Sequence, residues 1–159
     1  NPQCSICPLR DRCVANATGQ QAALPVKQVK TKTRDRFFNY LHIATPKGLH
    51  RQQRGPGDIW QGLFELPLIE SDNSLHTQEL LKLPHFTSLA GSGGIIVKHS
   101  DPYIHLLSHQ RLHARFIVVR VKKVWSPKLL AVSSEQLHHY AFPRLIEKFM
   151  NDCGLTDLF

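Results

Sequence analysis

Residues 58–67 read DIWQGLFELP, a dense apolar stretch that contains one glycine and ends at a proline. A glycine inside an apolar run favours a bend, and a proline removes a backbone donor that a strand would need. The segment therefore predicts a short strand and a loop that lie over a hydrophobic core.

Segments on both sides of this stretch predict a sheet with a few helices. Runs of apolar, aromatic and β-branched residues predict strands, and Gly48 is placed to turn the first of them into a hairpin. Apolar residues at helical spacing predict a short helix that ends before Pro84 and a closing helix that starts at Ser133 and is interrupted at Pro143. The predicted strands cover residues 30–43, 49–54, 95–98, 103–107 and 114–124, and the predicted helices cover 74–83 and 133–150. We expect an α+β domain with a mixed sheet and packed helices, preceded by a short cysteine-rich stub.

The positive charge of the chain is confined to its first third. The 159 residues carry a net charge of +8, and residues 1–54 hold ten basic residues against Asp11 and Asp35. Such a local excess favours a polyanionic partner, with nucleic acid the commonest. No apolar run approaches the roughly 20 residues that a membrane span needs, and the first residues carry no signal-peptide pattern. We therefore expect no membrane contact and a cytoplasmic location.

Three cysteines lie close together at the N-terminus. Cys4, Cys7 and Cys13 have the spacing C-x2-C-x5-C, and residues 14–24 that follow them have the composition of a linker. Thiolates bind soft metals, and both a four-iron cluster and tetrahedral zinc require four ligands. From spacing alone, three interpretations remain open: part of a cluster site, a zinc site completed by a histidine, or free thiols.

Basic residues alternate with other residues just before the first predicted core strand. Lys30, Lys32, Arg34 and Arg36 occupy every second position. Because successive strand residues point to opposite faces, a strand here would place these four cations on one side. With Lys27, they are the predicted contacts to the phosphates of a nucleic acid.

The segments taken in order resemble the C-terminal part of the MutY-type A/G-specific adenine DNA glycosylases. Residues 58–67 are similar to the family's D-I-W-x-G-L-aromatic-E-x-P segment, residues 24–40 to its opening strand and residues 140–149 to its closing helix. Cys4, Cys7 and Cys13 resemble the end of its C-x6-C-x2-C-x5-C cluster loop. The resemblance implies that residues 1–13 end an iron–sulfur loop, 14–24 form a linker and 25–159 form a Nudix-like domain.

This resemblance also implies a cofactor. The three cysteines would be three of four ligands of a 4Fe-4S cluster, and the fourth would lie ahead of Asn1. We therefore expect the sequence to be a fragment. The cluster is expected in the full-length protein and not in this fragment.

The family carries Phe-Ser-His on a loop between two strands, where Leu107, Ser108 and His109 stand in this chain. In the family this loop reads 8-oxoguanine in DNA. The oxidised base has an N–H donor at N7, so a hydroxyl such as that of Ser108 can distinguish it from guanine. His109 would hold the loop or contact a phosphate, and Leu107 would stand in the wedge position. The alternative is an ordinary hairpin loop with Leu107 in the core.

The resemblance predicts a role in base excision repair. The parent enzyme would remove adenine paired with 8-oxoguanine by hydrolysis of its N-glycosidic bond, and its catalytic domain would precede this chain. The expected partners are double-stranded DNA with that lesion and the upstream catalytic domain. As an alternative to phosphate contact, the basic strand would face that catalytic domain. The expected setting is a bacterial nucleoid.

Two other functions were weighed. A Nudix-type hydrolase of oxidised nucleotides needs paired glutamates on a helix to hold a metal, whereas this chain offers only Glu70, Asp72 and Glu79 after Pro67. The domain alone is therefore expected to be inactive. A domain that only binds another protein would not need the Ser108 loop.

Overall fold

The computed structural model describes residues 2–24, 26, 32–91, 93–121, 124 and 126–153. It divides into two compact units, Asn1–Lys32 and Thr33–Phe159. The second unit thus begins at Thr33 rather than at residue 25, where the sequence predicted its start. Lys27 and Lys30, two of the predicted phosphate contacts, lie outside the described residues.

The first unit consists of three short helical turns. These are η1 (Cys4–Ile6), η2 (Arg10–Arg12) and α1 (Val14–Ala17). The side chain of Asn16 donates to the carbonyl oxygen of Arg10 at 3.3 Å, and that of Gln21 donates to Asn16 at 3.2 Å. The predicted linker, residues 14–24, therefore folds together with the cysteine-containing turns, because polar side chains of its own tie it to them.

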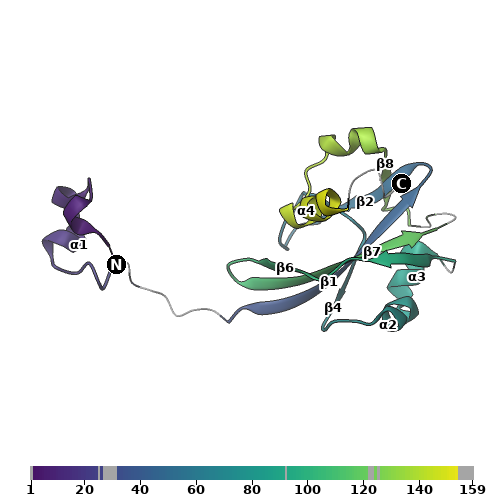
Figure 1. Cartoon of the computed structure of the whole chain (residues 1–159), viewed down its shortest axis with the longest axis horizontal. Helices are drawn as coiled ribbons and strands as arrows, with labels where there is room; N and C mark the ends of the chain where they lie inside the picture. The colour runs from purple at the N-terminus through teal and green to yellow at the C-terminus, as the bar shows by residue number, and fades with distance from the viewer. Residues whose placement is uncertain are drawn as a thin grey trace. The chain divides into compact units, whose positions relative to one another are not determined.

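The second unit is built on an eight-stranded mixed sheet (Figure 1). Its central path runs β3-β2-β1-β7-β5, while β4 pairs with β1, β6 with β7 and β8 with β2. At the centre, β1 and β7 are parallel, in register from Arg34 opposite Gln110 to Ala44 opposite Arg120. The strands are β1 (Arg34–Thr45), β2 (Gly48–Gln53), β3 (Phe64–Glu65), β4 (Leu68–Ser71), β5 (Ile95–His99), β6 (Tyr103–Leu106), β7 (Gln110–Arg120) and β8 (Leu130–Val132).

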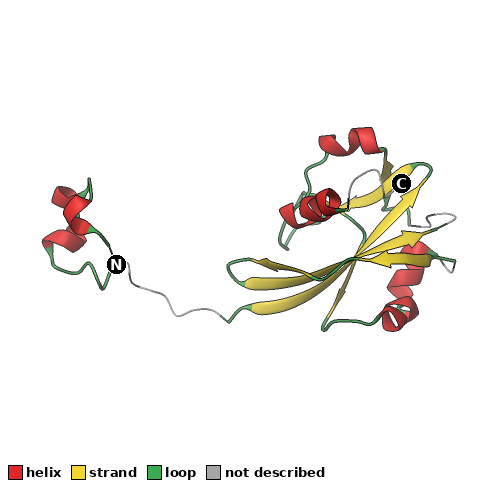
Figure 2. Cartoon of the chain, in the orientation of Figure 1, coloured by secondary structure: helices red, strands yellow, loops and turns green. Residues whose placement is uncertain are grey.

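Helices cover both faces of this sheet (Figure 2). The helices α2 (Thr77–Lys82) and α3 (Pro84–Ala90) pack over one face, and η3 (Ser134–His139) and α4 (Arg144–Asp152) pack over the other. The predicted apolar stripe of the closing helix is confirmed, since Leu145, Ile146, Phe149 and Met150 are all buried.

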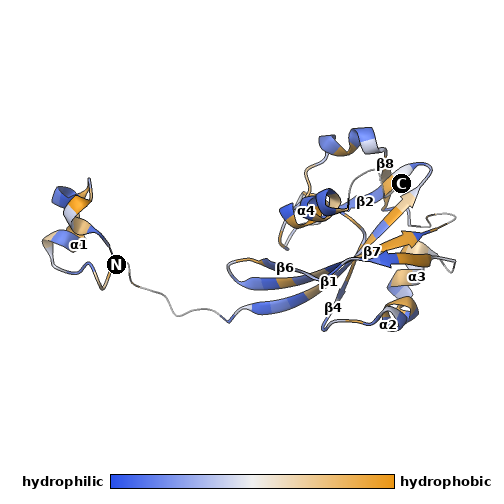
Figure 3. Cartoon of the chain, viewed as in Figure 1, coloured by the Kyte–Doolittle hydropathy of each residue, from blue (hydrophilic) through white to orange (hydrophobic). Residues whose placement is uncertain are grey.

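Alternation along β1 supplies both halves of the core. Phe38 and Tyr40 belong to the cluster beneath α4, whereas Leu41 and Ile43 belong to the cluster beneath α2 and α3. Figure 3 shows this as hydrophobic colouring on β1 and β7 where they lie between the helices. The predicted α+β class with packed helices is confirmed.

The predicted helix before Pro84 is confirmed, since α2 ends at Lys82. Pro84 opens a second helix, α3, that was not predicted, and its missing N–H costs nothing in the first turn. Other local expectations were wrong. The segment after Ser133 is the 3-10 helix η3 rather than an α-helix. Strands β4 and β8 were not predicted. Among the described residues, no helix is long and apolar enough to cross a membrane.

Candidate functional site

The hairpin between β6 and β7 brings the predicted recognition residues together. Leu106 pairs with Arg111, and the Leu107 N–H donates to the carbonyl oxygen of Gln110 at 2.8 Å. This pairing leaves Ser108 and His109 exposed at the tip. The hairpin therefore presents one hydroxyl and one imidazole to the outside.

Leu107 is placed differently from its neighbours at the tip. Its side chain is half-buried and packs against the core cluster beneath α4. The residue that the sequence placed in the wedge position thus anchors the hairpin to the domain. Leu107 also lines a pocket beside the hairpin tip, and its wedge role stays a prediction.

A pocket of about 300 Å³ opens beside the hairpin tip. The lining side chains come from two separate loops, Ile59 and Trp60 from one and Leu107, Ser108, His109 and Gln110 from the other. They offer a hydroxyl, an imidazole, an amide and an indole, and no carboxylate. Such a set suits a flat, uncharged, polar ring better than a metal ion.

Trp60 forms the aromatic wall of this pocket. Its backbone has φ = 60°, a left-handed conformation that is unusual for a bulky residue. Its ring meets that of His105 at 5.7 Å, edge to face. The sequence assigned residues 58–67 to the framework and missed this role. The sequence signal for this role was a tryptophan two residues before Gly62, in a segment that was expected to bend.

A charge network centred on Arg36, which is 7% exposed, adjoins the pocket through Asp58 and Gln110. Its guanidinium makes two bonds to Asp58, at 2.6 and 2.8 Å, two to Glu70, both at 2.6 Å, and one to the side-chain oxygen of Gln110 at 3.0 Å. The hydrogen bonds that Arg36 donates to Glu70 and Asp58 raise the pKa of Arg36, and its hydrogen bonds to Asp58 lower the pKa of that carboxyl. The structure therefore corrects the prediction that Arg36 contacts phosphate, because its donors are already used inside the protein.

A second arginine completes this network. Arg54 donates to Asp58 at 2.6 Å and forms an ion pair with the buried Glu65, which also accepts a hydrogen bond from Gln52 at 3.0 Å. Asp58, Glu65 and Glu70 are thus all engaged by arginines. Across the described residues, no group of three His, Cys, Asp or Glu side chains could hold a metal ion.

The two helices directly after β4, α2 and α3, together carry one carboxylate. This is Glu79 on α2, and it accepts a hydrogen bond from the His76 backbone N–H at 2.6 Å, as part of a capping box. A helix that polarises a pyrophosphate through a metal needs several carboxylates on one face. The helices α2 and α3, which are described throughout, lack that arrangement.

Positive charge does occur beside the hairpin. The Arg34 N–H donates to the carbonyl oxygen of His109 at 3.1 Å, and the Arg34 side chain is exposed, as is that of Lys32. Arg111, the second residue of β7, is half-exposed and lies 3.7 Å from Asp35. Of the predicted phosphate contacts, Lys32 and Arg34 are therefore available to a ligand.

The three N-terminal cysteines line one pocket of about 360 Å³ in the first unit. They form no disulfide, and the described residues include no group of three His, Cys, Asp or Glu side chains that is arranged to hold a metal ion. A four-iron cluster needs four thiolate ligands. The residues present therefore do not fit a complete cluster site.

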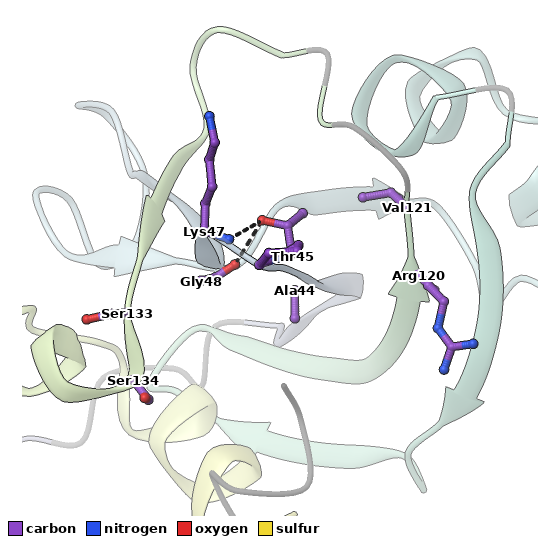
Figure 4. Close-up of a pocket in the computed structure, with 9 residues that line it drawn as sticks. Ala44, Thr45, Lys47, Gly48, Arg120, Val121, Ser133 and Ser134 are labelled. Carbon is purple, nitrogen blue, oxygen red and sulfur yellow. Dashed lines mark hydrogen bonds between the residues drawn. The ribbon is translucent and has the colours of Figure 1, made fainter.

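A larger pocket, of about 490 Å³, lies at the opposite end of β1 (Figure 4). Lys47 and Arg120 line it, but their side chains extend in different directions. Its cations do not converge on one point. We therefore take the hairpin pocket as the candidate site.

Comparisons with known proteins agree with this architecture. A family model described as NUDIX domain matches residues 39–152. Over 163 aligned residues the chain is 21% identical to the adenine DNA glycosylase of Buchnera aphidicola subsp. Acyrthosiphon pisum (strain APS), with 95% of this chain covered. The chain spans 42% of the length of that relative.

Two solved structures share the fold at low sequence identity. The C-terminal domain of mouse MUTYH, solved with human PCNA, matches with a TM-score of 0.59 and 15% identity, covering 74% of this chain and 86% of that chain. The MutT protein of Methanosarcina mazei Go1 matches with a TM-score of 0.54 and 18% identity, covering 76% of this chain and 93% of that one. These likenesses extend the similarity from sequence to the arrangement of strands and helices.

Proposed function

Because this chain belongs to the NUDIX domain family, we propose that it serves an adenine DNA glycosylase as the domain that recognises 8-oxoguanine opposite the adenine to be removed. The observation that carries the proposal is the pocket that Ser108 and His109 line together with Trp60 from a separate loop. The similarity to an adenine DNA glycosylase over 95% of the chain supports it.

The chemistry of the pocket suits the oxidised base. Oxidation of guanine converts N7 from an acceptor into an N–H donor and adds a carbonyl oxygen at C8. A hydroxyl can accept from N7–H and donate to a carbonyl oxygen, so Ser108 can match both changes. Guanine has an acceptor at N7 and no oxygen at C8, so the hydroxyl could make at most one of these two bonds to it, and this difference is the basis of discrimination.

The surroundings of the pocket suit a nucleic acid. Arg34, Lys32 and Arg111 are exposed beside or before the hairpin and would contact phosphates. Such contacts add affinity without sequence preference and position the reading loop. Excision itself would belong to a catalytic domain outside this chain, and the protein would act on DNA in the bacterial cytoplasm.

A cluster at the N-terminus is a separate proposal. Cys4, Cys7 and Cys13 would supply three ligands of a 4Fe-4S cluster, and a fourth ligand would come from outside this sequence. Iron and sulfide analysis of the natural full-length protein tests this, with Cys7→Ser expected to lower both. Unchanged iron and sulfide would refute it.

The decisive experiment concerns Ser108. In the natural full-length protein, the affinity for duplexes with adenine opposite 8-oxoguanine or opposite guanine is compared for wild type and Ser108→Ala. Loss of one hydrogen bond to the base is expected to reduce the preference for the oxidised base by roughly tenfold. Ser134→Ala, an exposed serine on η3, is the matched control.

Each outcome has a distinct meaning. A selective loss of preference in Ser108→Ala supports the proposal. If Ser108→Ala binds each duplex with the same affinity as wild type, the proposal is refuted. Release of phosphate or pyrophosphate from 8-oxo-dGTP with magnesium would instead support a nucleotide hydrolase.

A further inference from the structure

One guanidinium touches both loops that form the hairpin pocket. Arg36 Nη1 donates to Asp58 Oδ1 at 2.6 Å and also to Gln110 Oε1 at 3.0 Å. Asp58 precedes Ile59 and Trp60, which line one wall, and Gln110 itself lines the other. A single nitrogen atom is therefore shared between two segments that are far apart in the sequence.

The wall that carries Trp60 is held from two sides. The Ile59 N–H donates to Asp58 Oδ1 at 2.7 Å, and Arg54 Nε donates to the Ile59 carbonyl oxygen at 2.9 Å. Both groups of Ile59 are thus bonded to members of the charge network. The left-handed backbone of Trp60 follows directly and depends on this support.

The wall that carries Ser108 is held by Gln110. Its side chain accepts from Arg36, and its carbonyl oxygen accepts from the Leu107 N–H at 2.8 Å. The residue that closes the hairpin is therefore also the residue that joins it to Arg36.

Arg36 itself is fixed. Its five hydrogen bonds use Nε, Nη1 and Nη2, two carboxylates bind it in bidentate fashion, and its guanidinium carbon lies 4.8 Å from the centre of the Phe38 ring. Hydrogen bonds between charged groups are stronger than neutral ones, and burial limits screening by salt. The guanidinium is thus a rigid reference point for both walls.

We propose that Arg36 is a positioning residue that sets the distance between Trp60 and the Ser108–His109 tip, and that Gln110 transmits this setting to the hairpin. The effect on lesion preference rests on the proposed function, whereas the coupling of the two walls can be tested without DNA. Lesion recognition then depends on a residue that never meets the base.

The test cuts the link at Gln110, because Arg36 variants would also break the ion pairs with Asp58 and Glu70. Gln110→Ala removes the acceptor, Gln110→Glu keeps an oxygen for Arg36, and Gln136→Ala changes an exposed glutamine on η3. Hydrogen exchange of the Leu107 N–H and the NMR shift of the Trp60 indole N–H report on the two walls. The Leu41 N–H, which donates to the Pro67 carbonyl oxygen at 2.8 Å, reports on the core.

In Gln110→Ala we expect roughly tenfold faster exchange at Leu107 and a shifted Trp60 signal, with exchange at Leu41 unchanged. Gln110→Glu should restore both signals, and Gln136→Ala should alter neither. An unchanged Trp60 signal in Gln110→Ala overturns the coupling of the walls. Equal acceleration at Leu107 and Leu41 also overturns it, because that pattern indicates a general loss of stability.

DNA binding by the same variants separates the two proposals. If Ser108→Ala loses preference for 8-oxoguanine, Gln110→Ala is expected to lose part of it and Gln110→Glu to regain it. If Ser108→Ala retains its preference, the proposed function fails, while the exchange data still decide the coupling. If Gln110→Ala keeps the full preference for 8-oxoguanine while Ser108→Ala loses it, the positioning role of Arg36 in lesion recognition is overturned and the proposed function stands.

Discussion

Arg54 and Glu65 form an ion pair in the interior, with side chains only 7% and 5% exposed. The pair joins the loop after β2 to β3, and Glu65 also lies within hydrogen-bond distance of the Tyr40 hydroxyl, at 3.4 Å. Burial and the nearby carboxylate raise the pKa of Tyr40. The pair therefore ties the loop after β2 to β3 inside the domain.

Removal of Glu65 should strongly destabilise the domain. Glu65→Ala leaves Arg54 buried with one carboxylate partner, Asp58, instead of two, and such broken pairs cost about 3–5 kcal/mol. Urea unfolding followed by circular dichroism measures the loss. Glu135→Ala, at an exposed position on η3, should change the free energy of unfolding by less than about 0.5 kcal/mol. Equal stability of the two variants would show that the buried pair contributes nothing.

Gly48, at the turn between β1 and β2, should not tolerate a side chain. Its φ is +114°, and a Cβ built there would lie 2.1 Å from the Val132 carbonyl oxygen (Figure 4 shows the turn). We expect Gly48→Ala to cost about 2 kcal/mol or more in thermal unfolding. Gly55→Ala, where a Cβ meets nothing within 4 Å, is the control and should be nearly neutral. A melting temperature equal to wild type in Gly48→Ala would contradict the close approach of β8.

His42 should make the domain less stable in mild acid. Burial lowers its pKa from 6.5 to about 4, so the folded state holds the neutral ring while the unfolded chain binds a proton. This stability is complete above pH 6.5 and is lost as the pH falls toward 4, by roughly 3 kcal/mol in all. Urea unfolding at a series of pH values measures the slope.

Two variants test the origin of that slope. His42→Leu should flatten it, whereas His85→Gln, an exposed histidine, should leave it unchanged. A small slope should remain in His42→Leu, because burial and the charge of Lys47 also lower the pKa of His50. A full slope in His42→Leu would assign the effect to another group.

Charge reversal at Lys32 and Arg34 tests the phosphate contacts. If both side chains meet DNA phosphates, Lys32→Glu and Arg34→Glu should each weaken binding of all duplexes equally. Each should also reduce the slope of log K against log salt by about 1. Lys47→Glu, at the far end of β1, should leave the slope unchanged. The phosphate role fails if the slopes of all three variants equal that of wild type.

The sequence was informative where the pattern is local. The β-branched run in β7, the apolar stripe of α4 and the position of the Ser108 hairpin were all recognisable, because each depends on residues close together in the chain. The ion pairs of Arg36 could not be predicted, since its partners Asp58 and Glu70 are 22 and 34 residues away in the sequence. An alternating basic run looks the same in the sequence whether its cations face water or carboxylates of the folded chain.

Only one of the two loops that form the pocket was predicted, because the contact between them joins residues far apart in the sequence. Ser108 and His109 were identified through a resemblance to a family loop, whereas Trp60 was assigned to the framework. Only the folded chain brings the two loops together, through Arg36 and Gln110. Strands β4 and β8 were missed because they are four and three residues long and depend on pairing with β1 and β2.

The parallel pairing of β1 and β7 has a consequence for avidity. Because these strands run the same way, the entry into β1 and the entry into β7 lie at one end of the sheet, where the Arg34 N–H meets His109. The backbone of Arg34 is therefore fixed next to the hairpin tip. A phosphate contact by Arg34 and a base contact by the tip would then act on one duplex at high effective concentration, so two weak contacts would combine into strong binding.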